Sequence, residues 1–401
     1  MNQEMMIFEK DLSAPDPIPA AGIERAVKLM KNGRIHRYGE AKGDELDVVE
    51  LEREYAAYMG IDYCVGLNSC GCALFIALKT VGVKPGDKVL VNAFTLAPVP
   101  GAIAHCNAQP VLVEVNDDYL IDLADLRQKA ATSGAKVLMI SHMRGHIADM
   151  DAVVEICAEH GIALVEDCAH TMGATWDGRK MGTFGDVSCF STQTFKHINS
   201  GEGGLLVTNN ADIAAQAILY SGSYMLYHQH GARPEEAVFA KWKGVIPNFS
   251  MRMTNFAAAV LRPQIPLIDD RGVLWNKQYD WLAAHFAEIP HVVLPERDPR
   301  EGYVASSIQF NLVALSAEKM LTFQANCKAR GVFLKWFGGE EAVGFTSSHH
   351  NWEYMQESAE LPQTDRVMRG LFDMRIPLSL TEADAAQIGT IMHESMLATV
   401  R

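Results

Sequence analysis

The sequence is short of positive charge and has no apolar run long enough to cross a membrane. Its 401 residues include 35 Lys and Arg against 49 Asp and Glu, a formal net charge of −14. Such an excess of carboxylates repels phosphodiester backbones and anionic membrane leaflets. The most apolar stretch, residues 89–104, is interrupted by Asn92, Pro98 and Gly101, and a membrane helix needs roughly 20 apolar residues. We therefore expect no nucleic-acid partner and no membrane span.

The N-terminus also lacks the features of a secretory signal. It begins Met1-Asn2-Gln3-Glu4, without a basic start or an apolar stretch, and a signal peptide has both. We expect a cytoplasmic protein.

The cysteine and histidine patterns give no sign of a metal site. Of the eight cysteines, Cys70 and Cys72 are separated by one residue, with no second pair at zinc-finger spacing. We expect all eight to be reduced, buried thiols. His142 and His146 have the i,i+4 spacing of a zinc pair, but Gly145 between them favours a loop. We predict no metal.

Between about residues 63 and 208, short apolar runs alternate with segments of helical periodicity. The predicted strands are 63–67, 88–91, 110–115, 136–140, 163–166, 187–191 and 204–208, and the helices between them include 73–81, 123–131 and 150–160. Strands that are apolar on both faces and separated by helices indicate an α/β fold with a mainly parallel sheet covered on both sides. Ligands of such sheets bind at the carboxyl ends of the strands.

The pattern changes after residue 265. A long helix is predicted over about 270–287, then a strand region that contains proline, and a final helix after Thr381. We predict a large domain over 1–265, which includes an N-terminal arm, and a smaller α+β domain over 266–401.

Two segments at predicted strand ends carry groups suited to catalysis. Glu166 and Asp167 end a buried strand, where a carboxylate is costly unless it faces a cation or a polar partner. Asp167 could simply cap the next helix, or it could pair with a cationic ring nitrogen. Lys196 stands alone among small polar residues ahead of a glycine cluster, and a partly desolvated lysine is a nucleophile for carbonyl compounds.

A third segment, residues 68–73 (Asn-Ser-Cys-Gly-Cys-Ala), is a turn of small and polar residues between a strand and a helix. The free amides of such a helix start bind phosphate readily. A phosphate turn, then an aspartate that ends a strand, then a lysine are the parts that hold pyridoxal phosphate.

With these parts in this order, the sequence resembles the DegT/DnrJ/StrS family of sugar aminotransferases, enzymes of fold type I that use pyridoxal phosphate. The resemblance covers about residues 33–265 and continues more faintly to the C-terminus. It rests on the segments 37–39, 83–87, 93–95, 166–170, 178–186 and 191–204, together with the helix that contains Glu52.

The resemblance implies a role for each matching residue. Lys196 would form the Schiff base with the cofactor and move the proton, and Asp167 would keep the pyridinium nitrogen protonated. Ser191 and the amides of Cys70 and Gly71 would hold the phosphate. His170 would lie against the ring or its 3′-oxygen.

Asn248 matches the segment that in the family reaches the phosphate of the neighbouring subunit, which implies a homodimer with shared active sites. An ordinary turn residue before a buried helix is the alternative. Tyr38, His349 and His350 are candidates for binding substrate.

Two positions depart from the family pattern. Gly71 stands where many members have a hydroxyl residue in the phosphate turn, and Leu96 stands where an aromatic ring commonly stacks on the cofactor. Loss of that stacking would cost about 0.5–1.5 kcal/mol.

The resemblance implies an aminotransferase that moves nitrogen from L-glutamate or L-glutamine to a keto-sugar or related polyhydroxy ketone. Two alternatives stay open. Some family members are sugar dehydratases with histidine at the lysine position, and here His197 follows Lys196. The fold could also serve as a noncatalytic regulatory protein that binds a ligand.

Overall fold

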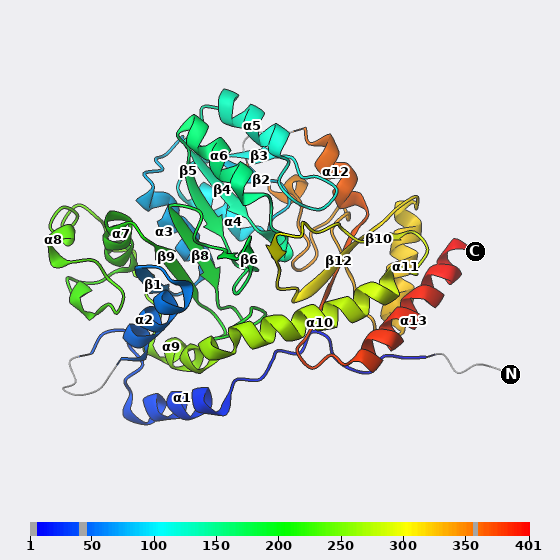
Figure 1. Cartoon of the computed structure of the whole chain (residues 1–401), viewed down its shortest axis with the longest axis horizontal. Coiled ribbons are helices and arrows are strands. Elements are labelled where there is room, and N and C mark those ends of the chain that lie inside the picture. Colours follow the sequence, from blue (N-terminus) through cyan, green and yellow to red (C-terminus); the bar gives the residue numbers. More distant parts are fainter. Residues whose placement is uncertain (1–5, 40–45, 356–359) are drawn as a thin grey trace.

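The core of the molecule is a seven-stranded sheet in the N-terminal two thirds of the chain (Figure 1). The computed structural model describes residues 6–39, 46–355 and 360–401. The strands, in the order in which they lie across the sheet, are β1 (Tyr63–Leu67), β9 (Gly204–Thr208), β8 (Val187–Ser191), β5 (Ala163–Asp167), β4 (Val137–Ser141), β2 (Lys88–Asn92) and β3 (Gln109–Val113). Only β9 runs antiparallel to its neighbours. The predicted mainly parallel α/β sheet is confirmed.

Helices cover both faces of this sheet, because its strands alternate apolar side chains to either side. Leu138 and Ile140 of β4 join one core with α2 (Asp47–Met59), α5 (Leu123–Thr132) and α6 (Met150–His160). Met139 joins a second core with α3 (Cys70–Thr80), α4 (Pro98–His105) and α7 (Ala211–Ser221). The remaining helical segments of this part are α1 (Ala20–Asn32), α8 (Glu236–Phe239), α9 (Asn255–Leu261) and the short turns η1 (Met143–Gly145), η2 (Tyr227–Gln229) and η3 (Arg262–Leu267).

The predicted strands 63–67, 187–191 and 204–208 match residue for residue, and the other four differ by one or two residues at their ends. The predicted helix 150–160 also matches. The predicted helix 73–81 begins at Cys70 instead, because the side chain of Ser69 caps it by accepting a hydrogen bond from the amide of Cys72 at 3.1 Å.

The C-terminal part begins with a long helix, α10 (Ile268–Phe286), that extends from the large sheet to the last helices (Figure 1). A four-stranded sheet follows, in the order β10 (Val292–Val293), β12 (Ser307–Leu312), β14 (Leu371–Arg375) and β13 (Lys335–Trp336). The helices are α11 (Ala317–Ala329), η4 (His349–Asn351), α12 (Pro362–Arg369) and α13 (Glu382–Val400), and a small sheet joins β11 (Glu301–Gly302), β6 (Thr175–Trp176) and β7 (Arg179–Lys180).

The N-terminal segment packs on this C-terminal part. The amide of Phe8 donates to the carbonyl of Arg330 at 2.8 Å, and Lys10 forms an ion pair with Asp384 at 2.6 Å. The boundary at residue 265 stays a prediction, but the arm assigned to the large domain is held by the small one.

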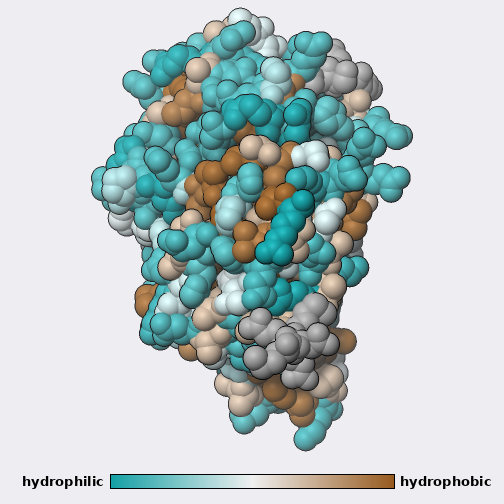
Figure 2. Space-filling model, turned by 90° about the vertical axis from the view of Figure 1, so that its right-hand side faces the viewer, coloured by the Kyte–Doolittle hydropathy of each residue, from teal (hydrophilic) through white to brown (hydrophobic). Residues whose placement is uncertain are grey.

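Figure 2 shows the molecule from the right-hand side of Figure 1. This face is mostly hydrophilic, with hydrophobic residues gathered near its centre. Among the helices that the structure describes, none has the length and apolar character needed to cross a membrane.

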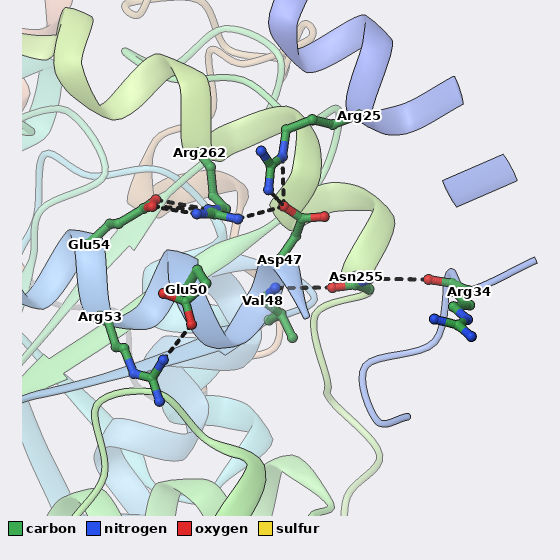
Figure 3. A network of polar contacts seen from close by, with 9 residues as sticks. All are labelled: Arg25, Arg34, Asp47, Val48, Glu50, Arg53, Glu54, Asn255 and Arg262. Atoms are coloured by element: carbon green, nitrogen blue, oxygen red, sulfur yellow. Dashed lines mark hydrogen bonds and ion pairs between the residues drawn. The ribbon is translucent and has the colours of Figure 1, made fainter. Parts of the chain in front are cut away.

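A network of ion pairs joins α1, α2 and η3 at the point where the chain turns into α10 (Figure 3). The guanidinium of Arg262 lies 2.8 Å from the carboxylate of Asp47 and 2.6 Å from that of Glu54. Arg25 of α1 also pairs with Asp47. Because Arg262 and Asp47 are largely buried, these contacts fix how α2 sits on the helices that lead to the C-terminal part.

We expect the substitution Arg262→Met to lower the free energy of unfolding by about 1–3 kcal/mol, because it leaves partly buried carboxylates without their donor. The matched control is Arg366→Met, since Arg366 and its partner Asp117 are both more than half exposed. The control should change stability by at most about 0.5 kcal/mol. Denaturant unfolding measures both, and equal effects would contradict the importance of this network.

Candidate active site

A cavity of about 700 Å³ opens at the carboxyl edge of the large sheet, a size suited to a cofactor or small substrate. Because β4, β5 and β8 run parallel, the loops that follow them meet at this edge. The predicted site residues that line the cavity are Cys70, Gly71, Leu96, Asp167, His170, Ser191 and Lys196. Seven of the predicted positions, spread over more than a hundred residues of the chain, therefore line one cavity.

Lys196 projects into the cavity from the loop after β8, and its Nζ lies 2.7 Å from Nε2 of His170. Burial and then the positive charge of Arg144 lower the pKa of Lys196 to about 8. Burial and the nearby charge of Lys196 lower the pKa of His170 well below its usual value. His170 is therefore neutral at physiological pH and can accept a hydrogen bond from the lysine.

The adjacent carboxylates of β5 have different tasks, because successive side chains of a strand point to opposite faces. Glu166 is fully buried and accepts hydrogen bonds from the amides of Gly182, Phe184 and Gly185, so it holds a loop. Asp167 faces the cavity.

Two donors hold the Asp167 carboxylate in place. One oxygen accepts from Ser141 Oγ at 2.7 Å, and the other accepts from the amide of Ala169 at 3.1 Å. A carboxylate fixed in this way at the cavity wall suits a cationic ring nitrogen.

The phosphate turn has the shape that an anion needs. The amides of Cys70 and Gly71 belong to the first turn of α3, where no intrahelical acceptor exists. A Cβ added to Gly71 would meet nothing closer than 3.9 Å, so space remains beside these amides. Gly204 packs directly against the turn, since a Cβ there would lie 2.5 Å from the carbonyl oxygen of Ser69. The glycine cluster after Lys196 thus lets β9 support the phosphate turn.

Ser191 and Leu96 complete this part of the cavity. Ser191 ends β8 and is buried, with its Oγ accepting from the amide of Gln193 at 3.3 Å. Leu96 packs beside the aromatic cluster of Phe94, Tyr119 and Phe337. The residues around the cavity therefore fit a phosphorylated pyridine aldehyde, with an aliphatic wall at the position of the usual aromatic ring.

Asn248 and Tyr38 are not among the described residues that line this cavity. Asn248 lies in a loop, where its side chain accepts from the amide of Ser250 at 3.0 Å. The Tyr38 hydroxyl lies 3.0 Å from Nε2 of His230, beside the buried ion pair between Arg37 and Glu52. The roles assigned to Asn248 and Tyr38 stay predictions.

His349 and His350 also lie outside the described lining, although Ser347 belongs to it. Their rings are 3.9 Å apart, and His350 Nε2 lies 2.7 Å from the carboxylate of Asp365. The ligand atoms of these three residues are close enough to hold a metal ion. A substrate role for the two histidines stays a prediction.

The other histidines of the sequence analysis point elsewhere. His142 lies 3.5 Å from Glu166, whereas His146 contacts Gln309 at 2.8 Å, so they have separate partners. His197 is buried against Trp275 with ring centroids 5.1 Å apart. Lys196, not His197, therefore faces the cavity.

Sequence reasoning missed the cationic side of the cavity, which consists of Arg144, Lys335 and Arg375. Arg144 follows β4 and could have been found by the rule that strand ends carry the site. Lys335 comes from the two-residue edge strand β13, and Arg375 ends the inner strand β14 of the C-terminal sheet. Nothing in their local sequence marks them.

The fold is α/β, and one cavity brings together a lysine with a lowered pKa, a carboxylate held by two donors and the amides of a helix start. The chain belongs to the DegT/DnrJ/EryC1/StrS aminotransferase family, which it matches over residues 20–393. The predicted family, fold class and aminotransferase class are confirmed. Enzymes of this family use pyridoxal phosphate, so the predicted cofactor is also confirmed.

Curated relatives are sugar and cyclitol aminotransferases. The chain is 33% identical to GDP-perosamine synthase of Caulobacter vibrioides over 62% of this chain and 66% of the relative. It is 31% identical to L-glutamine:2-deoxy-scyllo-inosose aminotransferase of Streptoalloteichus tenebrarius over 72% of this chain and 69% of the relative. The chain thus spans about two thirds of the length of these relatives.

Solved structures agree over nearly the whole chain. The crystal structure of 3-amino-5-hydroxybenzoic acid synthase has a TM-score of 0.83 and 25% identity, covering 97% of this chain and 99% of that one. The pyridoxal-phosphate form of a Streptococcus pneumoniae protein shares the fold at a TM-score of 0.82 and 20% identity, covering 98% of this chain and 100% of that one.

We expect Lys196 of the cofactor-free protein to react with aldehydes at lower pH than a lysine outside the cavity. Only the neutral amine is nucleophilic, so its rate should rise as pH increases toward about 8 and level off above it. Lys129, which lies outside the cavity in a part-buried ion pair with Asp125 on α5, is the control. Reductive methylation over a pH series with peptide mass spectrometry measures both rates. Parallel pH profiles for the two lysines would contradict the low pKa.

Proposed function

We propose that this protein transfers an amino group from L-glutamate or L-glutamine to a keto-sugar or related polyhydroxy ketone, with pyridoxal phosphate attached to Lys196. The names of the relatives support this acceptor class, since they include a synthase of GDP-perosamine and an aminotransferase that acts on an inosose. The latter name also supports L-glutamine as a donor.

The observation that carries this proposal is the contact between Lys196 and His170 at 2.7 Å in a cavity that Asp167 also lines. Bound pyridoxal phosphate supplies an electron sink that stabilises negative charge at the substrate Cα. Asp167 would hold the ring nitrogen, and the amides of Cys70 and Gly71 would hold the phosphate. Lys196, with a pKa of about 8, can both accept and return a proton near neutral pH.

His170 fits the same scheme as a positioning group. As a neutral ring within hydrogen-bond distance of Nζ, it can orient the lysine amine without adding a second charge. If His170 holds the Lys196 amine in position before the reaction, less entropy is lost when the reactive geometry forms.

The two alternatives are less well supported. A dehydratase of this family with histidine at the lysine position would need His197 in the cavity, but His197 is packed against Trp275. A noncatalytic ligand-binding protein would have no need for a lysine with a lowered pKa beside a fixed carboxylate.

The proposal predicts that the cofactor-loaded protein absorbs near the band of lysine-bound pyridoxal phosphate and that L-glutamate or L-glutamine bleaches this band. Lys196→Ala should abolish turnover, because both the attachment point and the proton carrier are lost. Lys129→Ala, which changes a lysine of α5 outside the cavity, is the control and should leave turnover unchanged. Turnover that Lys196→Ala leaves undiminished would refute the catalytic assignment.

We further propose that the active enzyme is a homodimer in which Asn248 reaches the cofactor phosphate of the neighbouring subunit. In support, Asn248 lies in an exposed loop outside the cavity of its own chain. In a two-fold symmetric dimer, each subunit can offer such a loop to the partner's site in the same way.

Shared sites predict complementation between two inactive variants. Lys196→Ala and Asn248→Asp, the latter adding a negative charge beside the phosphate, should each lose activity alone. An equal mixture refolded together should regain about one quarter of the wild-type activity, because half of the dimers are mixed and each carries one intact site. Steady-state assays of the mixture test this, and no recovery would count against shared sites provided that mixed dimers form.

A further inference from the structure

One wall of the cavity is cationic, although the chain as a whole carries a net charge of −14. Arg144 of η1 and Lys335 of β13 line this wall. In the antiparallel pair of β13 and β14, Lys335 lies directly opposite Asp373, so the two side chains share one face of the sheet. Arg144 reaches the same point from the large sheet. The wall is therefore built by both parts of the chain.

A single carboxylate serves both cations. Asp373 is fully buried, and one of its oxygens lies 3.1 Å from Nη2 of Arg144 and 3.2 Å from Nζ of Lys335. Its other oxygen accepts a hydrogen bond from Gln309 at 2.7 Å. Arg375, two residues further along β14, pairs with Asp16 instead. One positive charge of the pair Arg144 and Lys335 is thus left without a matching carboxylate at this point.

Arg144 also has hydrogen-bonding capacity that the described residues do not use. Its Nε and Nη2 atoms are buried and have no hydrogen-bond partner in the described part of the chain, and the contact of Nη2 with Asp373 lacks hydrogen-bond alignment. Buried donors of this kind are rare in native proteins. The Arg144 backbone has φ 57° and ψ 19°, a left-handed conformation that is unfavourable for a long side chain. Strain of this sort gathers at functional sites.

These cations lie close to the reactive lysine. The charges of Arg144 and Lys335 both lower the pKa of Lys196, after the effect of burial. They come from η1 and β13, whereas the phosphate turn belongs to the start of α3. The cationic wall therefore consists of other residues than the expected phosphate site, although both line the same cavity.

We propose that Arg144 and Lys335 form an anion subsite that binds a carboxylate of the substrate beside Lys196. This inference rests on the proposed aminotransferase function. The planar guanidinium of Arg144 presents several donors to a carboxylate, and Lys335 adds a second charge. The carboxylate comes either from the amino donor or from an acceptor that carries one.

A direct binding experiment tests the subsite without any turnover. The cofactor-loaded protein is titrated calorimetrically with glutarate, an unreactive dicarboxylate. Lys335→Met and Arg144→Gln should each weaken glutarate binding about tenfold or more, because each removes one charged partner. The control Arg366→Gln removes a cation from an exposed ion pair on α12 and should leave the affinity unchanged.

We expect Lys335→Met to fold more readily than Arg144→Gln, because the Lys335 side chain is 35% exposed whereas that of Arg144 is 11% exposed. If Arg144→Gln fails to fold, the glutarate affinity of Lys335→Met still tests the subsite. Lys335→Arg, which keeps the positive charge, should bind glutarate like the wild type. Unchanged glutarate affinity in a folded Lys335→Met protein overturns the proposal.

The two half-reactions identify the source of the carboxylate. If it belongs to the donor, the concentration of L-glutamate that half-saturates bleaching should rise about tenfold or more in Lys335→Met. If it belongs to the acceptor, the same rise should appear for a carboxylated ring ketone such as 3-dehydroquinate reacting with the aminated cofactor form, with scyllo-inosose as the uncharged control. A rise for neither overturns the proposal.

The proposed aminotransferase function fails differently. In that case neither L-glutamate nor L-glutamine bleaches the wild-type protein. Glutarate binding would still report on the cationic wall.

Discussion

The parallel arrangement of β4, β5 and β8 is the constraint on which the active site depends. In register, Ser141 of β4 lies beside Asp167 of β5, and this pairing places the serine hydroxyl 2.7 Å from the aspartate carboxylate. The loop after β8 then brings Lys196 to the same edge of the sheet. Because parallel strands all end on one side, residues from distant parts of the chain meet there without any long-range motif.

Two residues next to the cavity, Gly204 and Glu166, hold this edge of the sheet in place. Gly204 allows the backbone of β9 to pass within contact distance of the phosphate turn. Glu166, facing away from the cavity, ties the segment 182–185 to β5 through backbone amides. Burial alone would raise the pKa of Glu166, but His142 and these amides lower it, so the carboxylate stays charged and holds its donors. On β5, Glu166 thus stabilises the strand and the neighbouring loop from one face, while Asp167 faces the cavity on the other.

The local charge of the cavity is opposite to that of the chain. Its described lining includes Arg144, Lys196, Lys335 and Arg375, against the carboxylates Asp167 and Glu202. These nearby cations therefore outweigh, inside the cavity, the repulsion of a phosphorylated cofactor by the negative charge of the whole chain. The field inside a partly enclosed cavity is set by the nearest groups, since distant surface charges are screened by salt over about 8–10 Å.

The sequence by itself determined the strands, the order of the site residues and the family. Short apolar runs bounded by turn residues mark β1, β8 and β9 residue for residue. The groups around Asp167 and Lys196 are local patterns that can be read along the chain. Only the tertiary structure decided which of Glu166 and Asp167 faces the cavity and that His197 points away from it. It alone also brought Lys335 to Arg144 through a shared carboxylate. The physical reason is that side-chain direction and contacts across domains depend on strand register and packing, which single-sequence periodicity does not encode.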